Sequence, residues 1–154
     1  MERIPMTTVR PATSGDSAAW LGMRHALWPD APEAELAQEA DEFFASRSRF
    51  IMAVLLACDA SGAGVGFAEL PIRSVVDGCE TDRVAYLEGW YVEPGARRRG
   101  VGRALIAAAE AWGRAQGCSE FGSDTQLWNQ DSAAAHAALG FTEVEQLRCF
   151  KKML

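Results

Sequence analysis

Residues 86–113 limit the fold more than any other part of the chain. An apolar stretch ends at Val92, a Pro-Gly turn follows it, and the apolar periodicity predicts an amphipathic helix over residues 101–116. Between them, residues 97–102 have the sequence RRRGVG. A strand that leads through such a loop into a helix presents backbone N–H groups and the positive end of the helix dipole to an anion. The segment therefore predicts a phosphate-binding junction within an α/β domain.

The spacing of Gly100 and Gly102 does not fit two common phosphate motifs. A P-loop needs Lys and then Ser or Thr after its second glycine, whereas Arg103 follows Gly102 here. The dinucleotide fingerprint needs a third glycine where Leu105 stands. Glycines at these positions leave the amides open to a diphosphate, and the arginines add charge-assisted hydrogen bonds. The alternative is that both glycines only begin a helix.

The rest of the chain predicts one α/β domain spanning residues 1–154, with residues 1–5 set aside as a candidate disordered extension. Prolines and glycines mark the ends of its elements, because proline disfavours a helical residue before it and glycine tolerates the left-handed cap. The element order is β-α-α-β-β-β-α-β-α-β, which favours a mixed, mostly antiparallel sheet with helices on both faces. The predicted strands are residues 7–13, 49–58, 65–73, 84–92, 120–123 and 141–152, and the predicted helices are residues 14–28, 32–46, 101–116 and 129–139.

Composition and charge argue against several classes of function. The net charge is −6, the reverse of a nucleic-acid binder's basic footprint. The longest apolar run, residues 50–58, is too short to span a bilayer, and no secretory signal stands at the amino terminus, so we expect no membrane contact and a cytoplasmic location. The four cysteines and two histidines lack metal-ligand spacing, so we expect reduced thiols and no metal. Residues 33–42 are acidic, as either a solvated helix face or a rim that attracts a cationic substrate.

The motif R-x-x-G-x-G at residues 97–102, after a strand ending V-x-P, resembles the acetyl-CoA pyrophosphate loop of the GCN5-related N-acetyltransferases. The likeness covers essentially the whole chain, including the Leu-Gly-Phe before the last predicted strand. It implies the GNAT fold, whose central strands splay apart so that free backbone groups pair with the pantetheine arm and stabilise the thioester oxyanion. The coenzyme A contacts that it implies are Trp90, Tyr91, Val92, Arg97, Arg98, Arg99, Gly100, Val101, Gly102, Arg103 and Asn129.

A narrower likeness joins five short fragments, which resemble the bacterial aminoglycoside 6'-N-acetyltransferases when taken together. They are LWP at 27–29, GC at 78–79, LEG at 87–89, SDT at 123–125 and LGF-x-E-x-E at 139–145. The likeness implies direct acetyl transfer to an amine of a polycationic drug, and it implies a homodimer. The substrate contacts that it implies are Trp28, Val75, Glu88, Asp124 and Glu145.

Those residue types suit an aminoglycoside, because carboxylates pair with ammonium groups and an aromatic side chain forms a wall. The amine must be neutral to attack, so Glu88, beside the acetyl-binding strand, is the preferred catalytic base and Asp124 the alternate. Either carboxylate could instead cap a loop or pair with an arginine, and Trp28 could be a core anchor.

The sequence departs from the two families at two points. Phe150 stands on the last predicted strand where many members have a proton-donating tyrosine, so the thiolate is expected to leave into solvent. A histidine often found soon after the LWP fragment is also absent. An acetyltransferase for another amine, such as a peptide N-terminus, a lysine or a polyamine, remains an alternative. A non-catalytic coenzyme A-binding module is a third.

Overall fold

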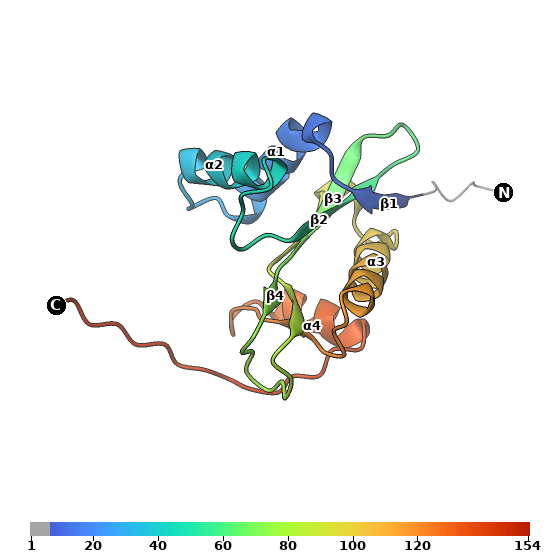
Figure 1. Cartoon of the computed structure of the whole chain (residues 1–154). Coiled ribbons are helices and arrows are strands. Elements are labelled where there is room, and N and C mark those ends of the chain that lie inside the picture. Colours follow the sequence, from blue (N-terminus) through green and yellow to red (C-terminus); the bar gives the residue numbers. More distant parts are fainter. Residues whose placement is uncertain (1–6) are drawn as a thin grey trace.

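Two small sheets meet at an interruption in the central strand of the fold (Figure 1). The computed structural model describes residues 7–154. In the larger sheet the order is β1-β2-β3-β6, all antiparallel, and in the smaller it is β4-β5-β7, with β5 and β7 parallel. The strands are β1 (Thr8–Pro11), β2 (Ala53–Cys58), β3 (Gly64–Leu70), β4 (Ile72–Arg73), β5 (Val84–Leu87), β6 (Gly89–Val92) and β7 (Phe121–Ser123).

Helices cover both faces of the larger sheet, as predicted (Figure 1). Successive residues of a strand point to opposite faces, so Leu55 packs toward α3 while Leu56 packs toward α1 and α2. The helices are α1 (Ser17–Leu27), α2 (Glu33–Phe44), α3 (Val101–Ala115) and α4 (Gln130–Ala138), with short 3₁₀ helices at Ser14–Asp16 and Pro94–Ala96. In the described part of the chain, no helix has the length and apolar character to span a membrane.

The central strand predicted over residues 84–92 divides at Glu88. Before this residue β5 pairs with β4 and β7, and after it β6 pairs with β3, so the chain passes from one sheet to the other. β6 is the last strand of its sheet, which leaves its outer edge without a strand partner. This is the predicted splay of the central strands. The strand predicted over residues 65–73 divides in the same way at Pro71, which has no N–H to donate.

A buried ion pair joins α1 and α2 to the sheet. Arg24 Nε lies 2.5 Å from Oε1 of Glu69, and both residues are almost fully buried. Trp20 Nε1 donates to the same oxygen at 3.0 Å, and Arg24 also donates to the Leu36 carbonyl. Arg24 also forms an ion pair with Glu39 of α2. The Glu39 side chain turns inward to do so, whereas most other acidic side chains of α2 are solvated. Each nitrogen of the Arg24 guanidinium therefore donates a hydrogen bond that helps to hold α1 and α2 on the sheet.

The predicted strand over residues 141–152 is wrong for this chain on its own: after α4 the chain is extended but pairs with no strand (Figure 1). Phe141 packs on Phe121 and His136, and Val144 lies against Gly78. Beyond these contacts the C-terminal tail, residues 145–154, leaves the body of the molecule. An extended segment becomes a strand only where another edge accepts its hydrogen bonds, and here none does. The candidate extension at residues 1–5 lies outside the described residues.

Candidate active site

The loop before α3 has the geometry predicted for an anion site. Gly100 is the N-cap of α3 in the left-handed conformation, with φ +81°, and Arg98 before it also has a positive φ of 62°. The first hydrogen bond of the helix runs from Ala104 N to the Gly100 carbonyl, and no described side chain caps the helix. The N–H groups of the first helical turn therefore point out of the helix end, where an anion can accept their hydrogen bonds.

The two glycines of this loop serve different purposes. Gly100 is surrounded by open space, so its requirement for glycine comes from its positive φ. At Gly102 a Cβ would lie 3.1 Å from Cζ2 of Trp90, so the absence of a side chain lets the Trp90 ring rest on the helix. Val101 is buried in the core and can offer an anion only its backbone N–H. The loop is built for contact through its main chain.

The arginines of the loop divide into two kinds. Arg98, Arg99 and Arg103 are exposed and form no ion pair with any residue of the described range 7–154. Arg97 instead folds back onto β6, where its Nε donates to the Val92 carbonyl at 2.9 Å and its guanidinium lies 5.8 Å from the centre of the Tyr91 ring. Arg97 therefore braces the edge strand β6, whereas the side chains of the other three form no ion pair with the described residues and can turn toward an anion.

Trp28 and Glu88 meet at the point where the two sheets part. Trp28 follows α1 and packs edge-on against Phe67, with ring centres 6.3 Å apart. A Cβ on Gly89 would lie 2.8 Å from Cη2 of Trp28, so the indole covers the strand directly beside Glu88. The Glu88 backbone is fixed by donation of its N–H to the Glu69 carbonyl at 3.0 Å, while its side chain is half-exposed. Trp28 is thus partly buried and still forms a wall next to the candidate base.

Asp124 joins this site through Tyr86. β5 and β7 are paired so that Tyr86 stands beside Gly122, and the Tyr86 hydroxyl donates to Oδ2 of Asp124. Burial raises the pKa of Tyr86 well above its usual value, and the Asp124 carboxylate raises it further, so the phenol stays protonated. The second carboxylate is therefore held at the mouth of the split by a neutral donor.

Arg73, which the sequence did not single out, completes the cluster. Its Nη2 forms an ion pair with Oε2 of Glu88, and its guanidinium carbon lies 3.8 Å from the centre of the Tyr86 ring. The sequence offered one signal for Arg73, namely a charged residue at the end of a mostly apolar strand. It stands 15 residues before Glu88 along the chain. Only the return of the chain through β5 brings the two together.

The remaining predicted residues are less closely grouped. Val75 is exposed in the loop between β4 and β5. Glu145 is exposed on the tail, and within the described residues it forms no hydrogen bond or ion pair with Glu88 or Asp124. Asn129 is the N-cap of α4, where its Oδ1 accepts from Ser132 N at 3.1 Å. Phe150 is 91% exposed and contributes nothing to the site of its own chain.

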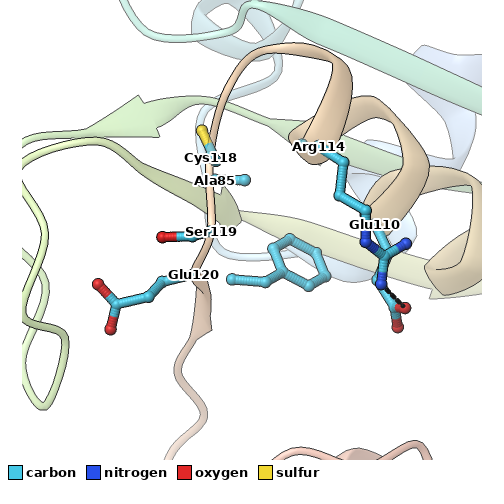
Figure 2. A pocket seen from close by; sticks show the side chains of 8 residues that line it. Ala85, Glu110, Arg114, Cys118, Ser119 and Glu120 are labelled. Atoms are coloured by element: carbon cyan, nitrogen blue, oxygen red, sulfur yellow. Dashed lines mark hydrogen bonds and ion pairs between the residues drawn. The ribbon is translucent and has the colours of Figure 1, made fainter.

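A separate small pocket opens at the far end of α3 (Figure 2). Glu110 and Arg114 of α3 line one side of the pocket and form a weak ion pair with each other at 3.5 Å. Glu120 lies on the other side of the pocket. The Glu120 carboxylate is already used, because it accepts from the N–H of Thr81 at 2.7 Å and from the Thr81 hydroxyl. None of the predicted site residues lines this pocket.

Comparison with known proteins decides the family. The sequence matches the family model described as "Acetyltransferase (GNAT) family" over residues 20–141. This chain belongs to the acetyltransferase (GNAT) family. In this GNAT acetyltransferase the exposed amides of the loop before α3, the glycine at positive φ and the free arginines have the chemistry to fit a diphosphate.

Relatives and solved structures agree along the length of this GNAT chain. The aminoglycoside N(6')-acetyltransferase type 1 of Klebsiella aerogenes is 53% identical over 146 residues, which cover 95% of this chain and 96% of the relative. The protein of the same name from Stenotrophomonas maltophilia is 45% identical and covers 96% and 94%. The aminoglycoside N-acetyltransferase AAC(6')-Iy in complex with CoA is 34% identical, covers 100% and 99%, and has a TM-score of 0.90.

Proposed function

We propose that this chain is an acetyl-CoA-dependent aminoglycoside 6'-N-acetyltransferase, which gives resistance by acetylating the drug. The observation that carries the proposal is the pair of carboxylates where the sheets part: Glu88 lies between β5 and β6, and Asp124 directly follows β7. On one face of the larger sheet lies an exposed helix N-terminus with free arginines, and on the other lies the Trp28 wall. The first suits a diphosphate, and the second suits a polyamine sugar.

Acetyl-CoA brings the activated acyl group, and the chain positions it. The N–H groups that begin α3, with Arg98, Arg99 and Arg103, bind the diphosphate. The free edge of β6 pairs with the pantetheine arm as an added strand would. A backbone N–H of the same edge donates to the thioester oxygen as negative charge develops on it.

Glu88 removes a proton from the ammonium group, directly or through one water, because only the neutral amine can attack. The amine nitrogen then forms a bond to the acetyl carbon and loses its second proton to solvent, and the bond from that carbon to sulfur breaks. The thiolate leaves and takes a proton from solvent, which a thiol with a pKa of about 8.5 tolerates. Asp124 binds a second ammonium group and helps to orient the sugar. Val75 and Glu145 are proposed as outer contacts of the drug, and Asn129 as a further contact of the carrier.

The test uses purified protein, acetyl-CoA and kanamycin. We expect one added acetyl group by mass spectrometry, located at the 6'-amine by NMR, and a higher inhibitory concentration of kanamycin for bacteria that express the chain. A peptide N-terminus, a lysine peptide and spermidine compete in parallel, and kcat/KM for each decides between amines. Transfer to one of these but to no aminoglycoside would replace the proposed substrate.

We infer that two copies of the chain form a cytoplasmic homodimer. The tail carries large apolar side chains that a single chain leaves in water, namely Leu147, Phe150, Met153 and Leu154. Exposed apolar side chains arranged along one extended segment are typical of a surface that a partner covers. The occupant proposed here is a second copy, because β7 is the last strand of its sheet and can accept a strand from outside.

A further inference from the structure

The guanidinium of Arg73 lies between the carboxylate of Glu88 and the face of the Tyr86 ring. It forms an ion pair with the carboxylate and stacks 3.8 Å above the centre of the ring. The hydroxyl of the same ring donates to Asp124, so the Tyr86 side chain links the guanidinium to the second carboxylate of the site. The chain thus places one of its own cations where the proposed substrate brings several.

A carboxylate beside an aromatic face is what recognises an ammonium group. The Tyr86 ring offers a neutral face, because its phenol stays protonated against Asp124. In the absence of substrate, the Arg73 guanidinium neutralises the Glu88 carboxylate. It also occupies the space between this carboxylate and the Tyr86 ring. A second cation at the same distance would be repelled.

We propose that Arg73 is an internal stand-in for a substrate ammonium group, which an aminoglycoside must displace from Glu88. The inference rests on the proposed function, because it takes Glu88 as the group that meets the reacting amine. Arg73 and Glu88 are each about 40% exposed on their side chains, with 41% for the arginine and 43% for the glutamate. Exposed pairs of this kind shift an equilibrium only about a few-fold, so displacement is easy and the arginine lowers the affinity for the drug by a similar factor.

The test measures kanamycin binding by calorimetry and the steady-state kinetics of Arg73→Gln and Arg73→Lys. For R73Q we expect the Kd and KM for kanamycin to fall about 2- to 5-fold, with the KM for acetyl-CoA unchanged. For R73K, which keeps the cation, both values should stay close to wild type. Arg114→Gln is the matched control, because it removes the same charge from an exposed residue at the far pocket of Figure 2.

Two results would overturn the inference. A higher Kd and KM in R73Q would mean that Arg73 binds the sugar itself, and a lower kcat with unchanged Kd would mean that it only positions Glu88. The calorimetry separates this inference from the proposed function. If kanamycin binds but is not acetylated, the function fails while a tighter R73Q complex still supports the Arg73 role. If the wild-type protein binds no aminoglycoside, both fail. Melting temperatures confirm that each variant is folded.

Discussion

At the scale of single residues, the two carboxylates of the site have different partners, and this difference indicates different roles for them. Glu88 pairs with the half-exposed guanidinium of Arg73, whereas Asp124 accepts a hydrogen bond from the phenol of Tyr86, which burial keeps neutral. A proton acceptor must exchange partners during the reaction. Glu88 is therefore better suited to take the amine proton, and Asp124 to hold a fixed position.

Replacing the proposed base tests this assignment. Glu88→Gln should lower kcat about 100-fold, at the low end of what a positioned proton acceptor contributes, with little change in the KM for acetyl-CoA. Asp124→Asn should mainly raise the KM for kanamycin. Glu110→Gln, at the far end of α3, serves as the control and should match wild type. An E88Q variant with wild-type kcat would remove Glu88 from the mechanism.

A second residue-scale prediction concerns pH. Hydrogen bonds from Arg10, with others from Thr13, hold the pKa of Asp16 well below its usual range. A lowered pKa in the folded state means that the stabilisation is present above the unfolded value and disappears as the pH falls. Asp16→Asn should cost about 1 kcal/mol of unfolding free energy at pH 7, and the gap from wild type should close as the pH falls below about 4.

Thermal unfolding between pH 3 and pH 7 measures this gap. Asp41→Asn, an exposed carboxylate of α2, is the control and should show no such pH-dependent difference. A D16N deficit that is constant over the whole pH range would contradict the ionic explanation.

At the scale of elements, the loop and helix at 97–115 could be read from the sequence because local chemistry determines them. The apolar stripe of α3 and the Gly-Arg loop act within a few residues of chain. The break at Pro71 has a local cause in the missing N–H of proline, whereas the break at Glu88 depends on which strand lies alongside, and no local pattern encodes that. The same holds for Arg73 and Glu88, which meet only after the chain turns back. The family resemblance therefore predicted the splay of the central strands, whereas nothing in the sequence predicted Arg73 as the partner of Glu88.

The loop prediction can be tested with a pair of matched glycines. Gly100 and Gly62 both have positive φ, of 81° and 87°, and both face open space. Alanine at either position should cost about 1 kcal/mol of stability, since a left-handed conformation is strained for a residue with a Cβ. Only Gly100→Ala should also raise the KM and the calorimetric Kd for acetyl-CoA, because only there does the strain move phosphate-binding amides. Equal effects on acetyl-CoA from both variants would remove the loop from carrier binding.

At the scale of the whole molecule, the Arg24–Glu69 pair decides how the helical layer sits on the sheet. A signal was present: Arg24 falls on the apolar face of α1 beside Trp20, and Glu69 interrupts the apolar strand β3. Arg24→Met leaves a buried carboxylate without its partner and should cost about 3–5 kcal/mol in urea unfolding. The double variant with Glu69→Met should recover much of this loss. A double variant as unstable as R24M alone would show that the pair contributes by packing and not by charge.

The tail gives the last prediction, and it concerns the assembly. The pattern over residues 141–152 predicted a strand, yet in a lone chain this segment pairs with no strand, so the pattern and the structure agree only if a second copy pairs with it. Light scattering should give a mass of two chains for wild type and one for Phe150→Asp, which places a charge among the apolar tail residues. Lys151→Glu, on the same exposed tail, tests whether any new negative charge has this effect and should remain dimeric. On the proposal that paired tails bring Glu145 to the drug, the F150D monomer should also bind kanamycin more weakly. A wild-type monomer that acetylates kanamycin at full rate would show that neither the dimer nor Glu145 is needed for the function.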